Sequence, residues 1–153
     1  MTAPSSGARR TLAELSIPSE PGNERRAMEE VAAVVSDLGL SENTLERLKT
    51  AVAEAALNAM EHGNHYRVEL PVLIKVSVSE VDLSVKITDE GSGPPAFHSQ
   101  TPDIEAKLEG MQTPRGWGLF LIKNMVDEMR VSGNPDHHTI ELVIYLKGDD
   151  DAG

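Results

Sequence analysis

The most suggestive chemistry lies in the stretch Thr50–Tyr66, where polar residues interrupt a run of small apolar ones. Glu54, Asn58 and His62 recur every four residues, which places them in one stripe along a helix. A carboxylate and a carboxamide one turn apart could hold a hydrated divalent cation, because hard ions take oxygen ligands and keep several waters. A solvated helix face with a chance Glu/Asn pair is the competing interpretation.

A second candidate is an acidic residue at the end of an apolar strand. The segment 83–89 alternates with a period of two, and Asp89 has the same parity as Leu83, Val85 and Ile87. The pattern therefore predicts that Asp89 points toward the core. A carboxylate in that position is costly unless other groups donate hydrogen bonds to it.

Two glycine pairs are candidates for phosphate-binding turns. The pair Gly91/Gly93 is followed by two prolines, which prevent the helix start that a dinucleotide fingerprint requires. The pair Gly116/Gly118 opens an apolar helix, where free backbone N–H groups suit an anion. No Walker lysine motif occurs in the sequence. Taken alone, each pair is more often only a turn or a helix start.

The composition restricts the class of function. A chain of 153 residues with 39% hydrophobic content fits one globular domain. The net charge of −11 argues against a general nucleic-acid binder and is compatible with a partner that has a basic surface. The absence of cysteine excludes disulfides and thiolate metal sites, and no apolar run is long enough for a membrane span. We expect a cytoplasmic protein that contacts neither nucleic acid nor membrane.

The hydrophobic periods predict the elements that must position these residues. Strands are expected at 11–17, 72–79, 83–89, 130–132 and 139–147, and helices at 23–38, from 42 to about 62 and at 119–129. Asn23 and Ser41 are the expected N-caps of the first two helices, and Gly63 ends the second. The histidines His137 and His138 are expected in a turn, with no metal centre built on histidine.

These elements predict an α/β (α+β) two-layer sandwich, in which helices cover one face of a mixed, mostly antiparallel sheet. The folded domain should cover residues 11–147, after a disordered segment at 1–10 and before an acidic tail at 148–153. Residues 94–115 form a loop long enough to suggest a function, apart from a short helix at 103–108.

The order of the motifs closely resembles the Bergerat-fold ATP-binding superfamily, known as GHKL. A helix with Glu54-x-x-x-Asn58 comes first, and Asp89-x-Gly91-x-Gly93 follows at a strand end. After the long loop, Arg115-Gly116-x-Gly118-Leu119 lies at a helix start. The resemblance covers about residues 12–146. Within the superfamily, the segments 54–64 and 114–122 look like the small anti-sigma-factor serine/threonine kinases.

The resemblance implies roles for the first two motifs. Asn58 would ligate a Mg²⁺ ion that bridges the phosphates of ATP. Glu54 would be the general base that takes a proton from a protein hydroxyl. Asp89 would accept a hydrogen bond from the adenine amino group, and Gly91 and Gly93 would let the backbone approach the base.

The third motif and the loop before it would enclose the phosphates. Residues 94–115 would form a lid, and the helix start with Gly116, Gly118 and Leu119 would cradle the phosphates. Arg115 would reach the γ-phosphate or the partner, and a plain surface role is equally open.

Two further residues are assigned to the ATP site on weaker grounds. His62 matches a position in the first motif, where packing against the nucleotide or the sheet competes with direct contact. Thr139 would supply a hydroxyl near the adenine from the last strand.

The resemblance implies an ATP-dependent serine/threonine protein kinase that acts as an anti-sigma factor. It would phosphorylate a STAS-domain anti-sigma-factor antagonist, sequester a sigma factor and, as is common in the family, form a homodimer. One alternative is an ATP-binding regulatory module that controls a partner without phosphotransfer. A simple ATPase is a second alternative, and a purely structural domain agrees least with three motifs in this order.

Overall fold

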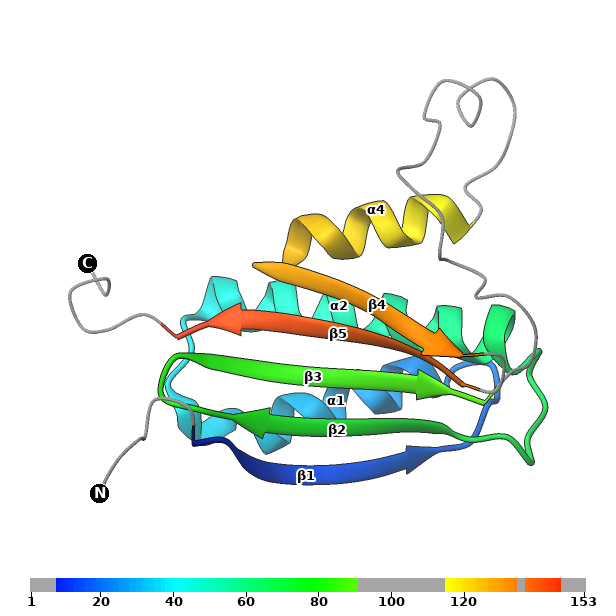
Figure 1. Cartoon of the computed structure of the whole chain (residues 1–153), viewed down its shortest axis with the longest axis horizontal. Coiled ribbons are helices and arrows are strands. Elements are labelled where there is room, and N and C mark those ends of the chain that lie inside the picture. Colours follow the sequence, from blue (N-terminus) through cyan, green and yellow to red (C-terminus); the bar gives the residue numbers. More distant parts are fainter. Residues whose placement is uncertain (1–7, 91–114, 135–136, 147–153) are drawn as a thin grey trace.

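The computed structural model describes residues 8–90, 115–134 and 137–146 (Figure 1). Its elements, in chain order, are β1 (Arg10–Ile17), α1 (Asn23–Val34), the 3-10 turn η2 (Ser36–Leu38), α2 (Glu42–Asn58), the π-helical turn η3 (Ala59–Gly63), β2 (Val72–Val78), β3 (Asp82–Asp89), α4 (Arg115–Met125), β4 (Glu128–Asn134) and β5 (His137–Tyr145). The helices α1, α2 and α4 lie on one face of a single sheet (Figure 1). The expected two-layer class is confirmed.

The sheet has the strand order β1-β2-β3-β5-β4. We expected a mixed sheet, but all four pairings between the described strands are antiparallel. The strands β3 and β4 run in the same direction, because both are antiparallel to β5. The hairpin that joins β4 to β5 places β5 between them, so these two strands never become neighbours.

The structure has the predicted N-cap at α2 and a different N-cap at α1. Ser41 caps α2 as predicted, since its side chain accepts a hydrogen bond from the Thr44 N–H at 3.1 Å. Asn23 is not the N-cap of α1. Gly22 holds that position with a φ of 97°, and the Asn23 side chain instead donates to the Pro18 carbonyl oxygen at 2.9 Å.

The later elements begin earlier than the sequence predicted. Helix α4 covers Arg115–Met125 rather than 119–129, because the chain enters β4 at Glu128. The expected turn at His137 and His138 is wrong, since both residues belong to β5. Residues 8–10 belong to the described structure, whereas the short helix expected at 103–108 and the acidic tail lie outside it. No helix of the described residues is long and apolar enough to cross a membrane.

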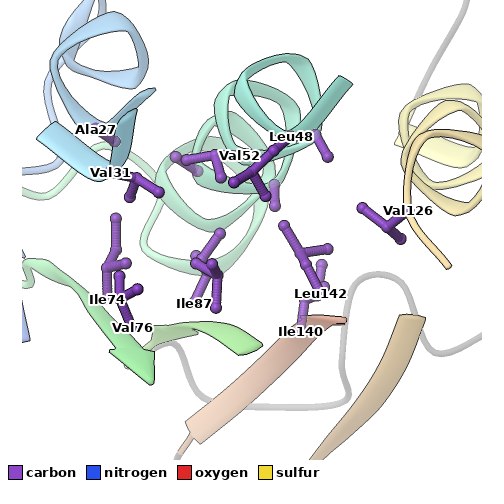
Figure 2. Close-up of a cluster of buried hydrophobic side chains, with 14 of the residues drawn as sticks. Ala27, Val31, Leu48, Val52, Ile74, Val76, Ile87, Val126, Ile140 and Leu142 are labelled. Atoms are coloured by element: carbon purple, nitrogen blue, oxygen red, sulfur yellow. The ribbon is translucent and has the colours of Figure 1, made fainter. Parts of the chain in front are cut away.

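The hydrophobic core fills the space between the helical layer and the sheet (Figure 2). Alternate residues of the central strands face the helices, as period two requires: Ile74 is 1% exposed, while its neighbour Leu73 is 39% exposed on the outer face. The side chains labelled in Figure 2 come from α1, α2, β2, β3 and β5 and from the residue after α4: Ala27, Val31, Leu48, Val52, Ile74, Val76, Ile87, Val126, Ile140 and Leu142. Helix α2 lies between α1 and α4 and holds the layer together.

The two faces of β2 provide a matched pair of variants. We expect Ile74→Ala to lower the free energy of unfolding by about 2–5 kcal/mol, because it leaves a cavity in the core. We expect Leu73→Ala, one residue away on the exposed face, to lower it by less than about 1 kcal/mol. Urea denaturation followed by circular dichroism measures both, and equal losses would contradict the assigned strand parity.

Candidate functional site

The motifs that the structure describes meet at one end of the sandwich. The C-terminal end of α2, the C-terminal end of β3 and the N-terminal end of α4 all lie at this end in Figure 1. The chain is continuous from α2 into the π-helical turn η3, which leads to Gly63. Residues that are far apart in the sequence therefore lie at the same end of the sandwich.

The polar stripe of α2 leads directly into the π-helical turn η3. Glu54 is half-buried and Asn58 is buried, one helical turn later. After Asn58 the hydrogen bonding changes: the Asn64 N–H donates to the Ala59 carbonyl oxygen, five residues back, at 2.8 Å. His62 is half-buried within this wider turn.

The carboxamide of Asn58 has an unused hydrogen-bonding group. Its side-chain nitrogen, Nδ2, is buried and has no hydrogen-bond partner within the described residues. A buried polar group left in this state costs about 1–3 kcal/mol. A ligand with polar atoms at the end of α2 would remove that cost, so this observation fits a binding site.

Asp89 points inward, as its parity predicted. Its side chain is fully buried and lies opposite His138 across the β3/β5 pairing. The Nδ1 atom of His138 is 3.0 Å from Oδ1 of Asp89, and the histidine is only 2% exposed. The costly burial of a carboxylate is thus offset in part by a hydrogen bond from the neighbouring strand.

Gly63 lets the end of η3 approach this carboxylate. A Cβ atom added at Gly63 would lie 2.3 Å from both Cγ and Oδ2 of Asp89, far inside van der Waals contact. The sequence identified Gly63 only as the end of a helix. The structure adds a second reason for glycine, which is the contact with the acid.

Asn64 joins the segments around the acid through a buried network. Its Nδ2 donates to the Leu70 carbonyl oxygen at 2.7 Å and to Ser19 Oγ at 3.0 Å. Its Oδ1 accepts the backbone N–H of Glu90 at 2.8 Å, which fixes the residue directly after Asp89. Sequence reasoning missed this role, because the partners come from loops whose positions no periodicity reveals.

The residues after Asn64 have an unusual backbone. His65 and Tyr66 both have positive φ, 53° and 56°, which costs side-chain-bearing residues about 1–2 kcal/mol each. The Tyr66 N–H bonds the Met60 carbonyl oxygen at 2.7 Å and closes the segment over η3. Burial raises the pKa of the Tyr66 phenol, and the carboxylates of Glu61 and Glu24 raise it further, so the ring stays neutral.

The structure brings His138 to the acid and leaves Thr139 away from it. Thr139 lies on the opposite face of β5, where its hydroxyl is 2.8 Å from that of Thr88. The alternation of Ile140, Leu142 and Ile144, extended two residues back, would have identified His138 as the inward residue.

The third motif is described only as backbone. Arg115, Gly116, Gly118 and Leu119 form the first turns of α4, which packs beside α2. The other predicted residues of the loop, Gly91 and Gly93 with the lid at 94–114, lie outside the described residues.

The contact between Gly63 and Asp89 can be tested by adding one methyl group. We expect Gly63→Ala to lower the free energy of unfolding by about 1–3 kcal/mol, because the new Cβ must displace the carboxylate. It should also shift the imidazole resonances of His138 in NMR spectra. Gly39→Ala is the control, because Gly39 has a φ of 74° but open space around it. That variant should lose a similar free energy through backbone strain while the His138 resonances stay in place. Unchanged resonances in Gly63→Ala would contradict the contact.

Several proteins of known name are similar to this chain over most of its length. An anti-sigma F factor of Bacillus thuringiensis (strain Al Hakam) is 32% identical over 133 residues, covering 81% of this chain and 85% of the relative. The serine-protein kinase RsbW of Bacillus subtilis (strain 168) is 29% identical over 139 residues, covering 89% of this chain and 86% of the relative. An anti-sigma F factor of Thermoanaerobacter sp. (strain X514) is 28% identical over 145 residues, covering 91% and 96%.

A solved structure has the same fold. The RsbU and RsbW domains of Rv1364c from Mycobacterium tuberculosis match 89% of this chain with a TM-score of 0.63 and 14% sequence identity. The chain spans 33% of the length of that longer protein. The family model of the histidine kinase-like ATPase domain matches residues 17–144, which include both α2 and the Asp89–His138 pair. This chain belongs to the histidine kinase-like ATPase domain family.

Proposed function

We propose that this protein is an ATP-dependent serine/threonine protein kinase that acts as an anti-sigma factor. The names of its relatives, anti-sigma F factor and serine-protein kinase RsbW, support both halves of the proposal. The observation that carries it is the buried carboxylate of Asp89, at the same end of the fold as the Glu54/Asn58 stripe and the start of α4.

The described residues fit a bound adenine nucleotide. Asp89 is an acceptor held at the end of β3, which suits the amino group of adenine. The N-terminal end of α4, with Gly116 and Gly118, would supply backbone N–H groups to the phosphates. The unpartnered amide of Asn58 indicates that a polar ligand belongs at the end of α2.

Asn58 would also hold Mg²⁺ through its amide oxygen. Amide and carboxylate oxygens are hard ligands, and Mg²⁺ bound with nucleotide is typically held by one or two protein oxygens besides phosphates and water. The ion would neutralise charge on the phosphates during transfer.

Glu54 would act as the general base. It lies on α2 one turn before Asn58 and is half-buried, so part of its side chain is open to a partner. In this role it would take the proton from a serine or threonine hydroxyl of the partner as the hydroxyl oxygen attacks the γ-phosphorus, while the bond from that phosphorus to the β–γ bridging oxygen breaks and ADP leaves.

The proposed partners are a STAS-domain anti-sigma-factor antagonist, which is the phosphate acceptor, and a sigma factor, which is sequestered. A homodimer in the cytoplasm is proposed as the working form. The net charge of −11 favours basic docking surfaces on the partners.

Nucleotide binding is tested first with an isosteric change at the acid. We expect wild-type protein to bind ATP with Mg²⁺ and Asp89→Asn to weaken the affinity at least about tenfold, because an amide replaces the acceptor with a group that also donates. Isothermal titration calorimetry measures the dissociation constants. Asp82→Asn, at the other end of β3, is the matched control and should bind ATP as wild type does. No binding to wild type at millimolar ATP would refute the proposed function.

Phosphotransfer is tested with Glu54→Gln. We expect this variant to phosphorylate a purified STAS-domain protein about 10²–10⁴ times more slowly than wild type, at unchanged affinity for ATP, because only the base is lost. Mass spectrometry of the acceptor gives the rate, and Glu46→Gln, on an exposed part of α2, is the control. An unchanged rate would show that Glu54 is not the base. Tight ATP binding by a wild type that phosphorylates no acceptor would favour the regulatory module instead.

A further inference from the structure

We propose that His138 is a positioning residue for Asp89, and that it gives the site its preference for purines with a 6-amino group. The inference rests on the proposed nucleotide-binding function. It concerns which bases the site accepts, whereas the proposed function concerns whether a nucleotide binds and is used.

The contact between the two side chains defines which group donates. An ionised carboxylate has only acceptor atoms, so the hydrogen of the 3.0 Å contact belongs to Nδ1 of His138 and points at Oδ1 of Asp89. Both side chains are buried, at 2% and 0% exposure, where a charge-assisted hydrogen bond is stronger than in water.

Asp89 needs such a restraint to distinguish one base from another. The terminal torsion of an aspartate is broad, so the plane of its carboxylate is not fixed by rotamer preference alone. In this structure Nδ1 of His138 contacts Oδ1 of the carboxylate, and Gly63 lies close to Cγ and Oδ2. The two restraints come from different elements, β5 and η3, and together they hold one orientation.

The strand next to β5 makes room for the histidine. Gly133 of β4 pairs with His138 and has a φ of 152°. A Cβ atom at Gly133 would lie 2.4 Å from the His137 carbonyl oxygen and 3.0 Å from the His138 Cα. The close approach of β4 thus fixes the backbone of β5 at the residue that carries the imidazole.

The chemistry of the pair predicts discrimination between bases. A carboxylate that stays an acceptor attracts the amino group of adenine and repels the 6-oxo group of hypoxanthine. Loss of a hydrogen-bond donor favours the protonated form of a buried carboxyl, and a protonated carboxyl can donate to a 6-oxo group. Removal of His138 should therefore weaken selectivity, in addition to any effect on stability.

The experiment compares three nucleotides, each with Mg²⁺, by calorimetry on the full chain. ATP has the 6-amino group, inosine triphosphate has a 6-oxo group, and purine riboside triphosphate has neither. The variants are His138→Leu, His138→Asn, His138→Gln and Thr139→Val. The asparagine amide nitrogen occupies the place of Nδ1, whereas that of glutamine occupies the place of Nε2. Thr139 is the neighbouring residue on the opposite face of β5.

We expect the ratio of ATP to inosine triphosphate affinity to fall at least about tenfold in His138→Leu and His138→Gln, since a hydrogen bond to a charged group is lost. The affinity of these variants for purine riboside triphosphate should stay within about threefold of the wild-type value, since this base has no 6-substituent for Asp89 to contact. His138→Asn and Thr139→Val should keep the wild-type ratio.

Two results would overturn this inference alone, and a third would refute the proposed function on which it rests. An unchanged ratio of ATP to inosine triphosphate affinity in His138→Gln would show that Nδ1 does not set selectivity. This test remains valid even if His138→Leu fails to fold. Equal weakening of all three nucleotides would reduce His138 to a structural role. A wild type that binds no nucleotide would refute the proposed function itself. A wild type that binds ATP through Asp89 with selectivity independent of His138 would refute only the present inference.

Discussion

A buried carboxylate governs the arrangement of this protein. Removing Asp89 from water is expensive, and the fold surrounds it with groups that lower the cost. His138 reaches it from β5, and Gly63 brings the end of η3 against it. Asn64 holds the adjoining backbone through the Glu90 N–H. His138 of β5 and Gly63 of η3 thus converge on this one side chain, and Asn64 positions the backbone next to it.

Helix α2 contributes to the core and also carries the polar residues proposed for the site. Leu48 and Val52 on one side pack into the core, while Glu54 and Asn58 belong to the polar stripe. The change to π-helical hydrogen bonding directly after Asn58 widens the last turn, a feature that is frequent at functional sites. The positive φ angles of the next residues are further local strain, which the packed core of the same helix must support.

Local periodicity predicted the parts of the structure that depend on local rules. Period two located β2 and β3 and predicted that Asp89 faces the core, and the Ser41 cap was confirmed. The errors arose where distant contacts decide. The β4/β5 pairing placed His138 in a strand rather than a turn, and the wide turn after Asn58 is closed by bonds that no spacing reveals. Thr139 lies on the face of β5 opposite His138, as the alternation along the strand indicates. The roles assigned to the site residues remain predictions.

The position of β5 inside the sheet has a consequence for biosynthesis. It is the last described strand to leave the ribosome, yet it lies between β3 and β4 and pairs with both. Until it emerges, one edge of β3 has no partner strand and Asp89 lacks its contact with His138. Such unpaired edges are where partly made chains associate wrongly. The sheet is therefore completed only when β5 inserts between β3 and β4.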